Sequence, residues 1–194
     1  FLIYYLLIVI IAVVAKDNLH ATASQAGLAV GIYIIGTVVA RLLAGRFISV
    51  LGCRKMLYLG LFIYLASTAM YFYTPNLLML DSVRFINGFA YGITSTATST
   101  IIAAIIPQSR RGEGINYYGL STSLAAAVGP FLGILMLHSL GYDFIIAFCV
   151  ALIVICGIGA VIMKFKEPKL DIDSEAHKGI KISDYIEPRM NSIS

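Results

Sequence analysis

Residues 77–105 read LLMLDSVRFINGFAYGITSTATSTIIAAI, a long apolar run that carries two charged side chains near its start. A helix needs roughly 20 apolar residues to cross the ~30 Å hydrocarbon core of a bilayer. This run is long enough to do so, and similar apolar runs fill most of the chain between residues 1 and 163. The stretch therefore predicts a membrane-spanning helix that brings charge into the membrane.

The composition of the whole chain extends this prediction to several spans. Of the 194 residues, 59% are hydrophobic and only 12% are charged, whereas soluble domains carry about 25% charged residues. Residues 1–163 have room for six spans, separated by charged or turn-forming residues. We expect an all-α membrane protein, a six-transmembrane-helix bundle, with helices at 1–15, 26–47, 57–73, 77–105, 115–137 and 144–163.

The first apolar run allows two interpretations. It ends in Ala12-Val13-Val14-Ala15, which resembles a signal-peptide cleavage site. However, no basic region precedes the run, as a signal peptide requires. We therefore favour a first transmembrane helix that is truncated.

The positions of the charges predict an orientation in the membrane. The formal net charge is +4, and eleven of the fourteen Lys and Arg residues lie in residues 46–55, 106–114 and 164–194. Arg41 and Arg84 fall inside expected helices. Basic loops are typical of the cytoplasmic side, so this charge does not indicate a nucleic-acid partner. We expect a multi-pass protein of the plasma or inner cell membrane, surrounded by lipid, with residues 164–194 as a cytoplasmic linker.

The helix expected at 77–105 has one polar face. Asp81 and Arg84 lie three residues apart, within reach of an ion pair, and a charge inside a bilayer faces the bundle interior or a water-filled cavity. Further along this face we expect five small or polar residues to line a cavity: Asn87, Gly88, Tyr91, Thr94 and Thr98. The alternative is a satisfied ion pair near the outer interface, with hydroxyl groups bonded to backbone carbonyls.

Two further segments combine glycine with basic residues or with proline. Residues 45–55 read GRFISVLGCRK and predict a tight basic turn in which glycine permits close backbone approach. Residues 129–133 read GPFLG, where small residues let neighbouring helices touch and Pro130 loosens the helix. The alternatives are an ordinary basic turn and ordinary small-residue packing.

Tyrosine takes the place of tryptophan in this sequence. The chain has no tryptophan, so we expect tyrosine to anchor it at the two membrane interfaces. Seven tyrosines lie near expected helix ends: Tyr4, Tyr5, Tyr71, Tyr73, Tyr117, Tyr118 and Tyr142.

Taken together, these segments resemble the major facilitator superfamily. Residues 45–55 are similar to its signature loop, roughly G-x-L-a-D-r-x-G-r-k, through Gly45, Arg46, Gly52, Arg54 and Lys55, with Ser49 where the family usually has Asp. Residues 84–88 are similar to the motif R-x-x-q-G through Arg84, Asn87 and Gly88. Residues 129–133 are similar to the antiporter motif G-P-x-x-G-G through Gly129, Pro130 and Gly133.

The resemblance implies a fold and roles for these residues. It implies the N-terminal half of a twelve-helix fold, with a missing C-terminal six-helix half in the same chain as its partner. The residues matched at 45–55 would form a cytoplasmic gate, Arg84 would take part in proton coupling, and the Gly-Pro helix would shape the interface between halves. Ser49 carries no charge, so we expect a less stable outward-facing state than in family members with Asp.

The function that follows is proton-coupled export of small molecules, drugs or metabolites, by alternating access. The proton gradient is the energy source, and no cofactor or metal is expected. Asp81 is the only intramembrane acid of the expected helices and is a candidate carrier of the coupling proton. One alternative is an importer of a sugar or another metabolite. A remote alternative is a six-helix membrane protein without transport activity or an enzyme, although no intramembrane cluster of His and Cys supports an active site.

Overall fold

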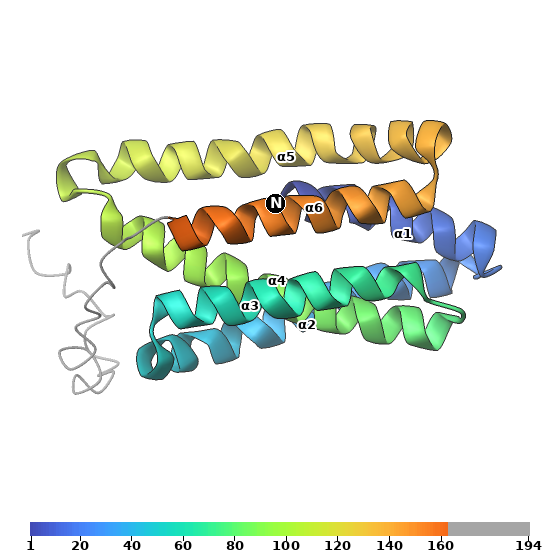
Figure 1. Cartoon of the computed structure of the whole chain (residues 1–194), viewed down its shortest axis with the longest axis horizontal. Helices are drawn as coiled ribbons and strands as arrows, with labels where there is room; N and C mark the ends of the chain where they lie inside the picture. Colours follow the sequence, from blue (N-terminus) through green and yellow to red (C-terminus); the bar gives the residue numbers. More distant parts are fainter. Residues whose placement is uncertain (163–194) are drawn as a thin grey trace, which may run out of the picture.

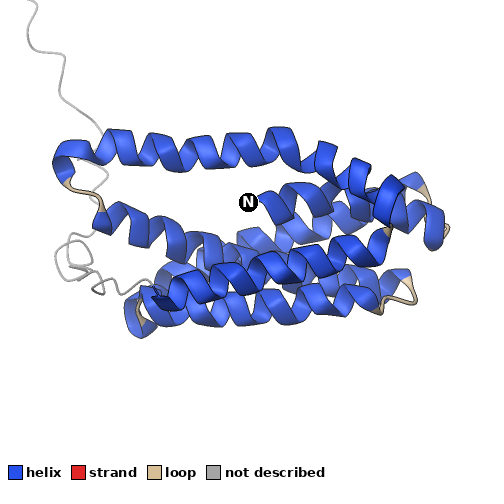
Figure 2. Cartoon of the chain, turned by 45° about the horizontal axis from the view of Figure 1, so that its top comes forward, coloured by secondary structure: helices blue, strands red, loops and turns tan. Residues whose placement is uncertain are grey.

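The computed structural model describes residues 1–162, so the expected linker at 164–194 and the last residue of the expected sixth helix lie outside the described residues. Six long α-helices follow one another along the chain (Figure 1): α1 Leu2–Asn18, α2 Ala23–Leu51, α3 Cys53–Ala69, α4 Leu77–Ile105, α5 Arg111–Leu140 and α6 Tyr142–Ile162. Two short 3-10 helices, η1 Met70–Phe72 and η2 Gln108–Arg110, precede α4 and α5. Residues 1–162 contain no strand (Figure 2), and the predicted all-α fold is confirmed.

Local chemistry explains where several helices begin and end. At the start of α2, the Thr22 side chain accepts a hydrogen bond from the Gln25 backbone and the Gln25 side chain accepts one from the Thr22 backbone, which forms a capping box. Asn76 caps α4 by accepting a bond from the Met79 backbone at 2.9 Å. Gly52 and Gly141 both have φ of +84°, a conformation that favours glycine, and each ends one helix just before the next begins.

The loops predicted at two breaks are longer than the observed ones. The sequence predicts a break at 46–55, but α2 continues to Leu51 and α3 starts at Cys53, so only Gly52 interrupts the helices. Likewise, α5 already starts at Arg111 within the break predicted at 107–114. A helix in a membrane satisfies its own backbone hydrogen bonds, so charged residues at its end do not by themselves stop it.

Glycine sets the closest contacts between helices. α4 packs along α2 and α3, and α1 packs along α5. At the crossing of α2 and α4, a Cβ added to Gly88 would meet the backbone carbonyl of Tyr33, and Gly36 faces the backbone of Phe85 in the same way. Such close approach is typical of small residues in membrane helix pairs.

Four segments of residues 1–162 are long and apolar enough to cross a membrane: Ala23–Ile48, Cys53–Phe72, Gln108–Leu140 and Tyr142–Ile162. The other two long helices are α1, which has 17 residues, and α4, whose polar face lowers its hydropathy. Figures 1 and 2 show that α1 begins beside the middle of α5 and α6, not at an end of the bundle. The first residues of the chain therefore lie at mid-height in the bundle.

Candidate transport site

Arg84 is the central charged group of the bundle. It is fully buried on α4, and its Nε donates a hydrogen bond to the backbone carbonyl of Ala29 on α2 at 3.1 Å. Its guanidinium carbon lies 4.6 Å from the ring centroid of Tyr33, in cation–π contact. Among the described residues, neither Nη1 nor Nη2 has a hydrogen-bond partner. Both terminal nitrogens of Arg84 are therefore buried without a hydrogen-bond partner in the described part of the chain.

The ion pair predicted between Asp81 and Arg84 is not formed in the described structure. Oδ1 of Asp81 is buried and has no hydrogen-bond partner among residues 1–162, and both terminal nitrogens of Arg84 are unpartnered. The reason is geometric: Arg84 extends toward α2, where its Nε binds the Ala29 carbonyl. The carboxyl group and the guanidinium thus lie one turn apart on α4 without forming an ion pair within the described residues.

Two residues expected to line a cavity lie between helices. Asn87 is fully buried, and its Nδ2 donates hydrogen bonds of 2.9 Å to Oγ of Ser67 and to Oγ1 of Thr68 on α3. Gly88 faces the Tyr33 backbone on α2. These positions make Asn87 and Gly88 packing residues that join α4 to α3 and α2.

The other three residues of the polar face border a cavity. The cavity has a volume of about 460 Å³ and lies among α1, α3, α4, α5 and α6, with Tyr91, Thr94 and Thr98 in its wall. Thr94 and Thr98 donate their hydroxyl hydrogens to carbonyls of their own helix, each at 2.8 Å. The wall is therefore less polar than its sequence indicates, and aliphatic and aromatic side chains make up most of the rest.

A cluster of tyrosines beside this cavity was not predicted. Tyr4 of α1 stacks on Tyr33 of α2 at 5.2 Å and on Tyr91 of α4 at 5.3 Å, measured between ring centroids. Tyr64 and Phe1 also approach Tyr91, at 6.2 and 6.4 Å. Tyr4 was expected at a membrane interface, but in the described structure it lies between helices, beside Tyr33 of α2 and Tyr91 of α4.

The basic segment at 45–55 is folded mainly as helix. Gly45, Arg46 and Ser49 belong to the last turns of α2, although the side chain of Ser49 lies outside the described parts. No atom of another segment lies within 4 Å of a Cβ added to Gly45, so this glycine makes no close helix contact. Gly52 forms the turn.

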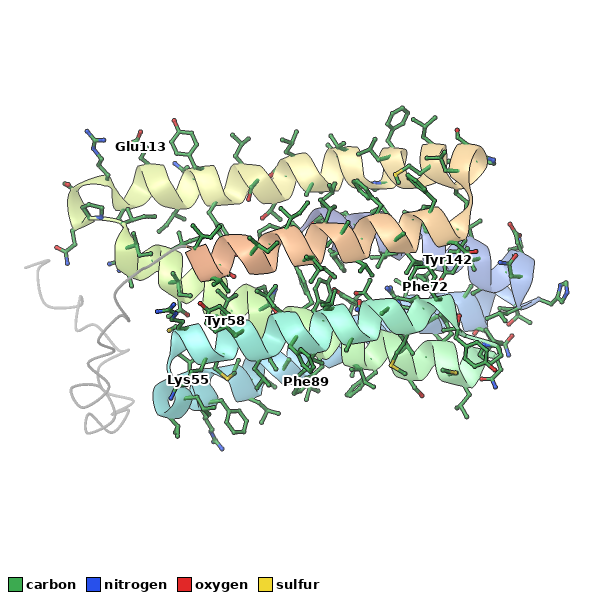
Figure 3. All side chains as sticks on the ribbon, viewed as in Figure 1. Lys55, Tyr58, Phe72, Phe89, Glu113 and Tyr142 are labelled. Carbon is green, nitrogen blue, oxygen red and sulfur yellow. The ribbon has the colours of Figure 1, made fainter. Side chains whose placement is uncertain are left out.

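The first turn of α3 is attached to the end of α6. Nε of Arg54 donates to the Tyr58 hydroxyl at 3.0 Å, and that hydroxyl donates to the Ala160 carbonyl at 3.2 Å. Lys55 is exposed, and Figure 3 shows Lys55, Tyr58 and Glu113 at one end of the bundle and Phe72 and Tyr142 at the other. The end with Lys55 and Glu113 contains described basic residues that the sequence predicts to lie on the cytoplasmic side.

The Gly-Pro segment of α5 faces α1. A Cβ added to Gly129 would meet Tyr5, and one added to Gly133 would meet Ile10. Pro130 lies inside α5 without ending it. The glycines thus serve a contact within this bundle, and a role between two halves stays a prediction.

No group of three or more His, Cys, Asp or Glu side chains within residues 1–162 is arranged to hold a metal ion. The polar side chains that the described residues bring to the site are those of Arg84, Asp81 and the tyrosines.

Comparison with known proteins identifies relatives of this chain. A family model described as Major Facilitator Superfamily matches residues 1–185. The uncharacterized MFS-type transporter MJ1560 of Methanocaldococcus jannaschii is 28% identical over 139 residues, which cover 72% of this chain and 36% of that protein. The uncharacterized MFS-type transporter YtbD of Bacillus subtilis is 26% identical over 165 residues, or 85% of this chain and 40% of that protein.

A further relative carries a more specific name. The putative metabolite transport protein YncC of Bacillus subtilis is 31% identical over 130 residues, which cover 63% of this chain and 27% of that protein. This chain therefore spans less than half the length of each of the three relatives.

Proposed function

This chain belongs to the major facilitator superfamily, and on that premise we propose that the complete protein is a proton-coupled secondary transporter that exports small molecules. Alternating access would expose a site near the middle of the membrane to each side in turn. The relatives are named as transporters, which supports transport in general. The proposals of proton coupling and of outward transport rest on residues of this chain, in α4 and in α5.

The observation that carries the proposal is the pair of unneutralised groups on α4. A buried carboxyl group holds a proton more tightly, and a nearby cation favours its release. Asp81, with its buried Oδ1, and Arg84, with two buried nitrogens that have no partner among residues 1–162, stand one turn apart on α4 and would supply both effects. A shift of Arg84 toward or away from Asp81 during the transport cycle would change how tightly Asp81 holds its proton.

The proposed direction rests on α5. The segment from Gly129 to Gly133 resembles the antiporter motif, and its glycines pack α5 directly on α1. The resemblance to the antiporter motif supports export in exchange for protons.

Everted membrane vesicles that contain the complete gene product test the proposal. Respiration acidifies the vesicle interior, and acridine orange reports the pH gradient. We expect at least one compound of a panel of lipophilic anions, cations and neutral molecules to dissipate the gradient only when the protein is present. Asp81→Asn should abolish this response, whereas Asp143→Asn, which changes an exposed acid at the start of α6, should preserve it. A response that survives Asp81→Asn would remove Asp81 from the coupling mechanism.

Import is the second candidate, since YncC is named a putative metabolite transport protein. A proton symporter draws substrate and protons in together. In right-side-out vesicles, its substrate would therefore make the external medium more alkaline, and in everted vesicles external substrate would leave the gradient intact. The vesicle orientation that responds decides between export and import.

A further inference from the structure

Two groups on α2 hold the guanidinium of Arg84. Its Nε donates to the backbone carbonyl of Ala29 at 3.1 Å, and its guanidinium carbon lies 4.6 Å from the ring centroid of Tyr33. Ala29 and Tyr33 are four residues apart on α2, so they lie on the same face of the helix, about one turn from each other. Arg84 is thus fixed at two points by a helix other than its own.

The ring of Tyr33 is itself held in place. Its side chain is 1% exposed, and Tyr4 of α1 stacks on it with a distance of 5.2 Å between the ring centroids. Its backbone belongs to the tight crossing of α2 and α4, where the Thr37 hydroxyl lies 3.0 Å from the carbonyls of both Tyr33 and Gly88. Gly88 follows Arg84 by one turn on α4. Tyr33 therefore keeps its place beside Arg84 as long as the two helices stay packed.

The ring, and not the hydroxyl group, is what Tyr33 contributes. Its hydroxyl oxygen is buried and has no hydrogen-bond partner within residues 1–162. A buried hydroxyl without a partner costs free energy, so the hydroxyl does not explain why a tyrosine stands at this position. An aromatic face attracts a cation through its quadrupole, and the contact with Arg84 supplies that explanation.

An aromatic ring holds a cation differently from a carboxylate. A carboxylate would neutralise the guanidinium, whereas a phenol ring is neutral and leaves the positive charge in place. The second contact, with the carbonyl of Ala29, is neutral as well. Both contacts draw Arg84 toward α2, and Asp81, one turn earlier on α4, forms no ion pair with it among the described residues. The position of the cation relative to the acid of α4 is therefore set by α2.

We propose that Tyr33 is a positioning residue for proton coupling: its ring holds Arg84 against α2 and so prevents a permanent ion pair with Asp81. A carboxylate that is paired with a guanidinium takes up a proton less readily. The inference rests on the proposed function, because it names the residue that controls the two charges of that mechanism. Tyr33 acts through Arg84 and matches none of the motifs quoted above.

A series of ring analogues at position 33 of the complete gene product tests the contact. Tyr33→Phe keeps the ring, and phenylalanines with one, two or three ring fluorines weaken its attraction for a cation with little change in size. We expect the thermal unfolding midpoint of Tyr33→Phe in detergent to equal or exceed that of the unaltered protein. The midpoint should then fall with each fluorine, by about 2 °C or more over the series. Midpoints that do not depend on the fluorines would overturn the inference.

Removal of the cation provides the matched comparison. Arg84→Met keeps a side chain of similar length without its charge, and the fluorine series should give equal midpoints in this background. Arg84→Gln serves the same purpose if Arg84→Met does not fold. The same series at Tyr73, which is exposed, is the control and should not change the midpoint. An equal fall with and without Arg84 would show that the fluorines act on packing and would contradict the contact.

The consequence for coupling is measured in the same everted vesicles, with a compound that dissipates the pH gradient. Tyr33→Phe should keep the response. The variant with three fluorines should lower its initial rate roughly three-fold or more, because Arg84 is then free to pair with Asp81. An initial rate that stays the same along the series would overturn the positioning role, even if the midpoints fall.

The outcomes also separate this inference from the proposed function. If a compound dissipates the gradient and neither the midpoint nor the rate depends on the fluorines, the transporter stands and the role of Tyr33 falls. If the midpoints depend on the fluorines only when Arg84 is present and no compound dissipates a gradient, the contact stands, whereas proton-coupled transport falls together with the role of Tyr33 in it.

Discussion

At the scale of single residues, two buried polar side chains of α4 bind this helix to its neighbours. Arg84 and Asn87 are fully buried, yet each leaves atoms without a hydrogen-bond partner among the described residues. A buried polar atom without a partner costs free energy. Their bonds to α2 and α3 therefore matter more than hydrogen bonds at the surface.

The bond network of Asn87 yields the first prediction. Asn87→Ala removes two hydrogen bonds of 2.9 Å to α3, and we expect it to lower the free energy of unfolding by about 1–3 kcal/mol. The thermal unfolding midpoint in detergent measures this effect. Ser99→Ala is the control, because Ser99 is exposed and bonds only to the Thr96 carbonyl of its own helix. Equal midpoints for the two variants would show that the network adds no stability.

The sequence predicted which polar residue is buried better than it predicted which groups that residue contacts. The burial of Arg84 follows from its charge within an apolar helix, and it is observed. An ion pair between Arg84 and Asp81 could not be predicted with the same certainty. A spacing of three residues permits the ion pair, but Arg84 can instead bind a backbone carbonyl on another helix, as it does at Ala29. The stacking of Tyr4 on Tyr33 could not be predicted from the sequence, since it depends on how α1 crosses α2.

At the scale of helices, the crossing of α2 and α4 is the tightest joint. Gly36, Gly88 and Gly92 leave no room for a side chain between the two backbones. Among the glycines of α2, Gly36 packs against the backbone of α4, whereas Gly27 and Gly31 have open space around them. A glycine pattern indicates that a helix can approach another, and the partner's position decides which glycines are used.

This joint yields the second prediction. In Gly88→Ala the new Cβ would meet the backbone carbonyl of Tyr33, which cannot rotate away. We expect a loss of about 1–3 kcal/mol in the free energy of unfolding, typical of overpacking. Gly31→Ala on α2 should preserve or raise stability, because nothing lies within 4 Å of its added Cβ. The comparison of thermal midpoints checks it, and equal stability of both variants would argue against a tight crossing.

Helix boundaries were the least predictable feature at this scale. The charged residues near 46–55 and 107–114 led us to expect α2 to end at residue 47 and α5 to begin at residue 115, but charge does not end a helix. Gly52 does so between α2 and α3, with its φ of +84°. Pro107 contributes to the break between α4 and α5, as it precedes η2.

At the scale of the whole molecule, hydrogen bonds between residues far apart in the sequence join α3 to α6 at the basic end of the bundle. The Tyr58 hydroxyl accepts a bond from Arg54 and donates one to the carbonyl of Ala160, 102 residues later. The sequence could not predict the hydrogen bond from Tyr58 to Ala160, because its acceptor is a backbone carbonyl, which every residue has. The bond holds the start of α3 against the last turn of α6.

This closure yields the third prediction. Tyr58→Phe removes the hydroxyl but keeps the ring, so the last turn of α6 should open more readily. We expect amide hydrogen exchange at residues 156–162 to accelerate roughly five-fold, the equivalent of one hydrogen bond of ~1 kcal/mol. Exchange at the start of α6 should not change. Tyr73→Phe, which alters an exposed tyrosine, serves as the control, and equal exchange in both variants would refute the closure.

The cluster of Tyr4, Tyr33 and Tyr91 also gives this chain an intrinsic spectroscopic probe. The chain contains twelve tyrosines and no tryptophan, so no indole emission masks the phenols. Closely stacked rings from three helices couple their ultraviolet transitions and share excitation energy. The rings of Tyr4, Tyr33 and Tyr91 therefore contribute to the near-ultraviolet circular dichroism, and a rearrangement of α1 against α2 and α4 should change this signal without any attached dye.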